Sequence, residues 1–285
     1  MADEAPCLVA VGDSITQAEP PWLSWRYYLW QSLLDAGMNA RWVGSMSARY
    51  TEGVMPNMTY NGAIFPQRHE GHWGWRADAV LRHLPTWAAA YACQPQCALV
   101  HLGTNDVCQG QDAASTINEI SQIANTLRSL GDEQMTLLLA VPIPSCCDRV
   151  ASILVPAIRA LGGNGSRVIV DMASGFDASA MLYDGCHPNE AGERHIAAAW
   201  RASVLHHCAG NGTYPPPSVA SHIPLVAAIV GPVGILLLLC VMIFCGPGSN
   251  ERKARLRNRF CCRRTGEADV AASASVTVPT EGGSD

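Results

Sequence analysis

The sequence predicts an α/β fold in which helices cover both faces of a parallel sheet. Short apolar runs rich in Val, Leu and Ile recur over residues 7–207, and longer helical patterns separate them. Because these runs are nearly continuous, the strands are expected to be buried on both faces, as in parallel sheets. Hydrophobic residues make up 48% of the 285 residues and charged residues 15%, which excludes wholesale disorder, a coiled coil and a collagen-like chain.

Five strands and five helices are expected in alternation. The strands are the apolar runs Cys7–Val11, Arg41–Val43, Ala98–Leu102, Met135–Val141 and Arg167–Val170. The helices are Trp22–Ala36, Ala77–Tyr91, Ala113–Leu130, Arg149–Leu161 and Glu190–His207. Ligands of such sheets bind at the carboxyl ends of the strands, so the residues that follow each strand are candidates for a functional site.

The end of the chain carries a different pattern. Residues 223–245 read IPLVAAIVGPVGILLLLCVMIFC, 23 residues without a charge, and a helix of that length spans the ~30 Å hydrocarbon core of a bilayer. A buried helix of a soluble protein is the alternative. Residues 252–264 hold six Arg and the only Lys of the chain. The positive-inside rule places this segment in the cytoplasm and residues 1–222 outside it.

We therefore expect four regions: a folded domain over 1–210, a Pro-rich stalk over 211–222, a transmembrane helix over 223–245, and a basic, then disordered cytoplasmic tail over 246–285. The expected partners are a lipid bilayer, through 223–245, and no nucleic acid, because the folded domain is acidic. No signal peptide is visible at the start, so a leader is expected to be missing; the span itself is the alternative targeting signal.

The cysteines favour an oxidised, extracytoplasmic domain. Eight of the 12 precede the apolar run, an even number that suits disulfides, with buried free thiols as the alternative. One bridge is expected between Cys108 and the adjacent pair Cys146–Cys147, and a second between Cys93 and Cys97. Three N-glycosylation sequons also precede the run; they begin at Asn57, Asn164 and Asn211. Palmitoylation is expected beside the basic run, at Cys261 and Cys262.

Polar motifs follow the predicted strands. The first strand ends in Gly12-Asp13-Ser14, and a Ser at that place is presented at the rim of the sheet, as a nucleophile requires. Taken alone, this motif is equally an ordinary turn. Three further motifs lie at strand ends or in long loops, and therefore on the same edge. They are His69–Trp75 (HEGHWGW), Gly103–Asp106 (GTND) and Asp184–Asn189 (DGCHPN).

These four blocks, in this order, resemble the SGNH (GDSL-like) hydrolase family. The spellings GDSIT, HEGHxGW, HLGTND and DGxHPNxAG resemble its acetylxylan-esterase-like branch of carbohydrate esterases. The resemblance implies a flavodoxin-like three-layer sandwich around a five-stranded parallel sheet. It also implies ester hydrolysis with no metal and no cofactor.

Chemistry and the resemblance together predict the roles of the site residues. Ser14 would attack the ester carbonyl, and His187 would take its proton and later protonate the leaving alcohol. Asp184, three residues before His187, can reach the other ring nitrogen and fix the tautomer. The resemblance places the oxyanion hole at the backbone N–H groups of Ser14 and Gly74 and the side-chain amide of Asn105. Gly71 is the competing position in the same loop.

Other residues near these motifs have structural interpretations. Asp13 is expected to stabilise the turn before Ser14, and His101 to pack within its strand. His69 and His72, with Glu70, suggest a metal site, but no third ligand follows at zinc spacing, so no metal is expected.

Three more residues leave alternatives open. Trp73 and Trp75 either pack in the core or bind substrate by stacking on a sugar ring, and the family usually has a small residue in place of Trp73. Cys186 is either a free thiol or part of a disulfide that tethers the catalytic loop.

The function predicted from these observations is a membrane-anchored, outward-facing serine esterase that hydrolyses O-acyl esters of carbohydrates, acetyl esters first. A lipid-directed esterase or lysophospholipase is the first alternative. The second is a catalytically idle carbohydrate-binding surface protein.

Overall fold

In a computed structural model of the chain, residues 5–51 and 58–209 are described. They belong to one of two units into which the chain divides, Met1–Ala220. The expected stalk, transmembrane helix and cytoplasmic tail lie outside the described residues, as do the sequons at Asn57 and Asn211. Within the described part, no helix has the length and apolar character needed to cross a membrane.

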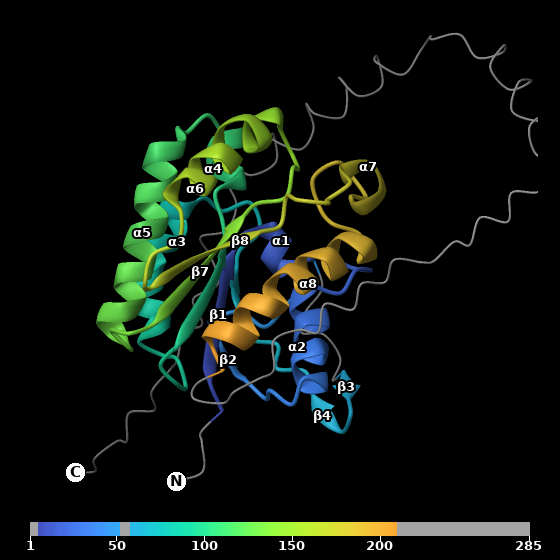
Figure 1. The fold of residues 1–285 in the computed structure, drawn as a ribbon, viewed down its shortest axis with the longest axis vertical. Coiled ribbons are helices and arrows are strands. Elements are labelled where there is room, and N and C mark those ends of the chain that lie inside the picture. The colour runs from blue at the N-terminus through green and yellow to red at the C-terminus, as the bar shows by residue number, and fades with distance from the viewer. Residues whose placement is uncertain (1–4, 52–57, 210–285) are drawn as a thin grey trace, which may run out of the picture. The chain divides into compact units, whose positions relative to one another are not determined.

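A parallel sheet forms the centre of the domain (Figure 1), and its strands in spatial order are β2, β1, β6, β7 and β8. Their bounds are Arg41–Val43, Cys7–Gly12, Cys97–His101, Thr136–Val141 and Arg167–Asp171. Every neighbouring pair runs parallel. The predicted α/β class with a parallel sheet is therefore confirmed. Counted in chain order along this path, the strands follow the 2-1-3-4-5 order of flavodoxin-like folds.

A sixth, very short strand differs from the five-strand expectation. β5 (Glu70–Gly71) pairs parallel with the end of β1, and Gly71 lies opposite Gly12. Its two residues lie inside the long loop after β2 and are too few to show a hydrophobic period. This strand places the HEGHWGW loop directly beside the end of β1.

Two helical layers cover the sheet (Figure 1). On one face lie α2 (Trp25–Asp35) and α8 (Glu190–His207), and on the other lie α3 (Ala77–Ala88), α5 (Ala113–Leu130) and α6 (Val155–Leu161). The side chains of β1 show why both layers are needed. Leu8 and Ala10 pack into the first layer, whereas Cys7, Val9 and Val11 pack into the second.

The helix α8 has the predicted bounds, whereas two other helices begin differently. α2 begins at Trp25 rather than Trp22 because the Ser24 hydroxyl caps it, accepting from the Arg26 amide at 3.3 Å. The buried carboxylate of Glu193, on α8, also accepts from the Trp25 amide, at 2.6 Å. The helix expected at Arg149–Leu161 is a π-helix over Val150–Leu154 followed by α6.

Five further short elements were not expected from the sequence. Three are single helical turns: α1 (Ser14–Gln17), α4 (Thr104–Cys108) and α7 (Ala178–Met181). The other two, β3 (Thr59–Tyr60) and β4 (Ala63–Ile64), form a small antiparallel sheet within the long loop. Elements this short show no periodicity and depend on tertiary contacts.

Four disulfides join the eight cysteines of the domain: Cys7–Cys93, Cys97–Cys208, Cys108–Cys147 and Cys146–Cys186. The expected bridge from Cys108 to the Cys146–Cys147 pair is confirmed, with Cys147 as its partner. The expected Cys93–Cys97 bridge is wrong. Cys97 packs on the face covered by α2 and α8, whereas Cys93 packs with Cys7 on the opposite face, so these two neighbours bond elsewhere.

Candidate active site

Ser14 lies where β1 turns into α1. Asp13 caps the short helix, because its Oδ1 accepts from the Ile15 amide at 3.0 Å. Gly12 permits the close approach of β1 to β6, since a Cβ there would lie 2.6 Å from the carbonyl oxygen of His101. Ser14 is therefore held at the carboxyl edge of the sheet, at the end of β1, whose neighbours β2 and β6 follow it in the chain on opposite sides.

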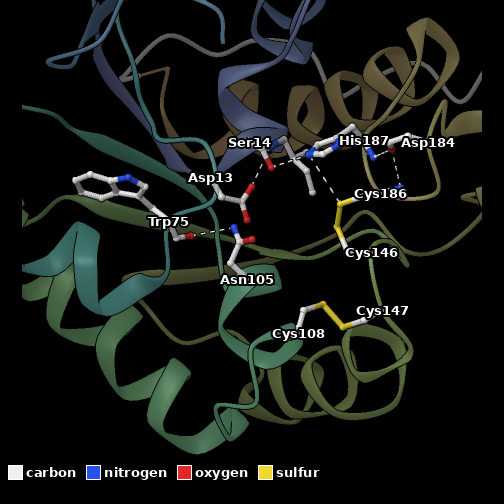
Figure 2. The surroundings of a disulfide bond; sticks show 11 residues. Asp13, Ser14, Trp75, Asn105, Cys108, Cys146, Cys147, Asp184, Cys186 and His187 are labelled. Atoms are coloured by element: carbon white, nitrogen blue, oxygen red, sulfur yellow. Dashed lines mark hydrogen bonds and ion pairs between the residues drawn. A yellow bond between two sulfur atoms is a disulfide. The ribbon is translucent and has the colours of Figure 1, made fainter. Parts of the chain in front are cut away.

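Three side chains predicted to act together form a connected hydrogen-bond chain (Figure 2). His187 Nε2 lies 3.0 Å from Ser14 Oγ, and His187 Nδ1 lies 2.7 Å from Asp184 Oδ2. Because a carboxylate can only accept, the imidazole proton is on Nδ1, which leaves Nε2 free to accept from the serine hydroxyl. Ser14 and His187 are each 6% exposed.

The loop that carries Asp184 and His187 is closed by its own hydrogen bonds. The Tyr183 amide donates to the His187 carbonyl at 3.0 Å. Asp184 Oδ1 accepts from the amides of Cys186 and His187, at 2.8 and 2.7 Å. Burial raises the pKa of Asp184, but the hydrogen bonds from His187 and the backbone outweigh it and hold the pKa below its ordinary value. The carboxylate is thus ionised beside the imidazole.

The loop around Gly74 is fixed against β1 and α1. The His72 amide donates to the Gly12 carbonyl at 3.1 Å, and the Trp73 amide donates to Gln17 Oε1 at 2.8 Å. Gly74 follows with a φ of 77°, a left-handed conformation that favours glycine. The competing Gly71 amide already donates to His69 Nδ1 at 2.9 Å, which favours Gly74 as the free donor.

The helix α4 attaches to the same loop from the other side. Asn105 Nδ2 donates to the Trp75 carbonyl at 3.0 Å, and its second hydrogen remains for another acceptor. Asp106 Oδ1 accepts from the Ala77 amide, the first of α3, at 2.9 Å. These bonds hold the segments of Ser14, Gly74 and Asn105 together at one edge of the sheet.

Asp13 is fully buried next to the nucleophile. Burial raises its pKa to about 7, against the opposing effects of the Ile15 amide and of His187. Its Oδ2 has no hydrogen-bond partner among the described residues. Asp106 is a second buried carboxyl at this edge, and burial raises its pKa to about 6.

His69, Glu70 and His72 bond to protein groups. Glu70 accepts from the amide and hydroxyl of Ser45, at 2.6 Å each, and from the Tyr91 hydroxyl at 2.8 Å. Its Oε2 also lies 3.0 Å from His72 Nε2. Burial, and then the charge of Arg26, hold the pKa of His69 well below its ordinary value. Over the described ranges, no three His, Cys, Asp or Glu side chains are grouped so as to hold a metal ion.

The aromatic faces of Trp73 are both occupied. Its ring stacks on Tyr50 at 4.1 Å and on His187 at 4.4 Å, with interplanar angles of 12° and 23°. Two rings so close to one centre would overlap if they shared a face, so they lie on opposite faces. The indole edge, and not a face, is what a substrate beside His187 would meet. Of the two roles left open for Trp73, packing and stacking on a sugar ring, this arrangement favours packing, because it leaves no open face for a ring.

Trp75 packs in a separate aromatic cluster. Its ring lies 4.8 Å from the His72 ring and 5.7 Å from that of Trp87. The contact of Trp75 with Asn105 is made by its backbone carbonyl. The aromatic neighbours missed by sequence reasoning are Tyr50 and Tyr183, the second of which stacks 5.9 Å from the His187 ring. Tyr183 directly precedes Asp184, but nothing in the pattern distinguishes it from other exposed tyrosines.

Comparison with known families decides the classification. The model of the GDSL-like lipase/acylhydrolase family matches residues 10–195, which include all four motifs. The chain belongs to this family. It is accordingly a serine ester hydrolase. No curated protein matches its sequence.

Solved structures similar to this hydrolase include carbohydrate esterases. A family 3 carbohydrate esterase from Talaromyces cellulolyticus is 26% identical with a TM-score of 0.59, over 70% of this chain and 97% of that one. An acetyl esterase mutant solved with an acetate ion is 26% identical with a TM-score of 0.58, over the same shares. A family 3 carbohydrate esterase from Clostridium thermocellum, at 21% identity and a TM-score of 0.55, covers 72% of this chain and 99% of its own, and shares the fold.

Proposed function

We propose that this hydrolase removes acetyl groups from carbohydrates, with Ser14 as nucleophile, His187 as general base and acid, and Asp184 as the group that orients the imidazole. The observation that carries the proposal is the hydrogen-bond chain from Ser14 Oγ through His187 to Asp184. Serine hydrolases of unrelated folds use the same arrangement. The acetyl and carbohydrate specificity is supported by the likeness to the two esterases at 26% identity, one of them solved with acetate.

Acylation begins when Ser14 Oγ attacks the carbonyl carbon of the ester. His187 Nε2, at 3.0 Å, takes the hydroxyl proton, and Asp184 stabilises the imidazolium through Nδ1. His187 then gives this proton to the sugar oxygen as its bond to the carbonyl carbon breaks, so that the sugar leaves as an alcohol and an acetyl group remains on Ser14. In deacylation, a water molecule takes the place of the sugar hydroxyl, and the same proton transfers release acetate.

The oxyanion of each tetrahedral intermediate needs donors that are already in place. We assign them to the amides of Ser14 and Gly74 and to the second Nδ2 hydrogen of Asn105. The bonds from Asn105 to the Trp75 carbonyl and from Trp73 to Gln17 fix these donors before substrate arrives. Each such donor contributes about 3 kcal/mol to the stability of the transition state.

Acyl-chain length separates this function from its lipid-directed alternative. The full-length protein would be assayed on p-nitrophenyl acetate, butyrate and octanoate, and acetate release from acetylated xylan would be measured, with Ser14→Ala as control. We expect kcat/KM to be highest for the acetyl ester and to fall as the chain lengthens. A rise with chain length would instead indicate a lipid substrate. Tight binding of acetylated xylan without hydrolysis would indicate a carbohydrate-binding protein.

We also propose that the hydrolase domain is extracytoplasmic and anchored to a bilayer by residues 223–245. Four disulfides in one domain suit an oxidising compartment, and the uncharged run followed by seven basic residues favours this orientation. The sequon residue Asn164 is exposed and open to glycosylation. Protease added to intact cells should remove the domain and spare a tag placed after Asp285. Digestion of the tag alone would reverse the topology.

A further inference from the structure

Two adjacent cysteines connect two parts of the active site. Cys146 and Cys147 lie in the segment after β7, and each forms a disulfide of its own. Cys146 bonds to Cys186, between Asp184 and His187, whereas Cys147 bonds to Cys108, the last residue of α4. Figure 2 shows the Cys146–Cys186 bridge below His187 and the Cys108–Cys147 bridge below that one. We call the chain of residues Cys186, Cys146, Cys147 and Cys108 the double bridge.

One end of the double bridge holds the loop of the general base. Cys186 Sγ lies 3.8 Å from His187 Nε2, and the neighbouring Gly185 carbonyl accepts from the Cys146 amide at 3.0 Å. The bonds between Asp184 and His187 are internal to this loop and would move with it. The double bridge therefore helps to fix the distance from His187 to Ser14. The contact between His187 and Asp184 does not depend on it.

The other end holds the helix of the oxyanion donor. Cys108 is three residues after Asn105 in α4, a helix of only five residues. The segment that carries Cys147 supports the same helix a second time, because Arg149 Nε donates to the Val107 carbonyl at 2.7 Å. The end of α4 is thus attached to the segment after β7 by a covalent bond and by a charged hydrogen bond.

We propose that Cys146, Cys186, Cys108 and Cys147 are positioning residues for ester hydrolysis: the double bridge sets the place of His187 relative to the oxyanion hole, and activity depends on its oxidation. The proposal rests on the roles given above to His187 and Asn105. Cys146 and Cys186 are both partly exposed, whereas both cysteines of Cys97–Cys208 are at most 3% exposed and Cys7–Cys93 has only Cys93 partly exposed. A soluble reductant therefore has access to both sulfurs of the bridge beside His187.

The redox step consumes one dithiol. A thiolate of the dithiol attacks one sulfur of Cys146–Cys186, and the other sulfur leaves as a thiolate that takes up a proton. The second thiol of the reagent then closes a cyclic disulfide and frees the second cysteine. The dithiol is oxidised by two electrons, and Cys146 and Cys186 both become thiols. Afterwards the loop keeps its internal hydrogen bonds but loses its covalent attachment to the end of β7.

The first experiment compares Cys146→Ala/Cys186→Ala with Cys7→Ala/Cys93→Ala, which removes a bridge from the opposite edge. With p-nitrophenyl acetate, we expect the first variant to lose about 10- to 100-fold in kcat with little change in KM, since a small misplacement of a catalytic group costs that much. The control should keep the kcat of the wild type. Equal kcat in both variants and the wild type would overturn the proposal.

Mild reduction tests the same point without a substitution. Dithiothreitol should lower the kcat of the folded wild type to that of Cys146→Ala/Cys186→Ala, in step with alkylation of Cys146 and Cys186, and reoxidation should restore it. The variant itself should respond less, because only Cys108–Cys147 is left to reduce at this edge. Full activity of wild type with both cysteines alkylated would contradict the proposal, even if the variants failed to fold.

The end of the double bridge at α4 is tested through Asn105. Cys108→Ala/Cys147→Ala should lower kcat in the wild type. It should not lower kcat further when Asn105→Ala is already present, because this bridge acts through Asn105. A purely structural bridge would cost the same in both backgrounds. His187→Ala separates the two proposals: if it stays active, the proposed mechanism fails, and if it is inactive while the bridge variants stay active, only the positioning role fails.

Discussion

The two edges of the sheet are built from the same strands but hold different chemistry. At the amino edge, β1 and β6 each begin with a buried cysteine, and the bridges of Cys7 and Cys97 close loops of 86 and 111 residues. At the carboxyl edge, the same strands lead into Ser14 and Asn105. The bridges there span only 39 and 40 residues and are partly exposed.

This difference indicates that one edge of the sheet contributes mainly to stability and the other mainly to catalysis. A disulfide that closes a long loop stabilises mainly by restricting the unfolded chain, and this effect grows with loop length. The carboxyl edge instead contains features that cost stability, such as the buried Asp13 and Asp106 carboxyls, each with an Oδ2 that lacks a partner among the described residues. We infer that the amino edge stabilises a domain whose opposite edge is arranged for reaction.

The largest effect on kcat should come from removing a catalytic side chain at the carboxyl edge. Ser14→Ala and His187→Ala should each lower kcat by at least about 10⁴-fold, because each removes a member of the proton-transfer chain. Circular dichroism and the melting temperature should stay close to those of the wild type. Substantial hydrolysis by folded Ser14→Ala would show that another group is the nucleophile.

The matching change at the amino edge should act on stability alone. Cys97→Ala/Cys208→Ala opens the 111-residue loop and should lower the free energy of unfolding by about 4–5 kcal/mol. Urea titration measures this loss, and kcat below the unfolding range should equal that of the wild type. A large loss of kcat without a loss of stability would contradict the division between the edges.

Asn105→Ala should give a smaller effect than loss of the triad. Removal of one oxyanion donor should lower kcat by about 10²–10³-fold with little change in KM, because the oxyanion exists only near the transition state. Steady-state kinetics on p-nitrophenyl acetate checks this split. A change confined to KM would make Asn105 a residue for ground-state binding.

The pH dependence of stability should reveal the cost of Asp13. Its pKa rises from 3.8 to about 7 on folding, so its contribution to stability is complete below pH 3.8 and is lost as the pH rises through about 7. Relative to the wild type, Asp13→Asn should gain about 2–3 kcal/mol between pH 5 and pH 8. Urea titrations at the two pH values measure it.

Asp112→Asn is the matched control for Asp13→Asn, because it changes an exposed helix cap whose pKa is lowered by the bonds from Ser115. Its contribution is present above the unfolded pKa of 3.8 and is lost only as the pH falls below it, so Asp112→Asn should not shift between pH 5 and pH 8. If the two variants shifted in the same direction, burial would not be the cause of the Asp13 effect.

The sequence was sufficient to predict the strands and helices that consist of a continuous hydrophobic run or a long periodic pattern. Five apolar runs predicted strand positions to within about one residue, and the length and polarity pattern of Glu190–His207 predicted α8 at its observed bounds. The site motifs were found for a related reason: each follows a strand or ends a long loop, and parallel topology brings such segments to one edge.

The remainder depends on contacts that no local pattern records. The single turn α1 forms around the Asp13 cap, and β5 exists because Gly71 lies against Gly12. Disulfide pairing follows from which face of the sheet each cysteine occupies, which is why Cys93 and Cys97 bond to different partners. The stacking of Trp73 between Tyr50 and His187 joins three distant segments.

The Cys97–Cys208 bridge also fixes the edge of the sheet at which α8 ends. Cys208 follows α8, and its bond to the first residue of β6 holds the outgoing chain at the amino edge. The five residues of β6, roughly 16 Å of extended chain, separate that point from the segment that carries Asn105. The catalytic residues therefore lie at the edge of the sheet opposite the one at which Cys208 is held. A pull applied to the residues after Cys208, as when the hydrolase is coupled through them to a solid support, is therefore taken up first at the amino edge and not at the catalytic residues.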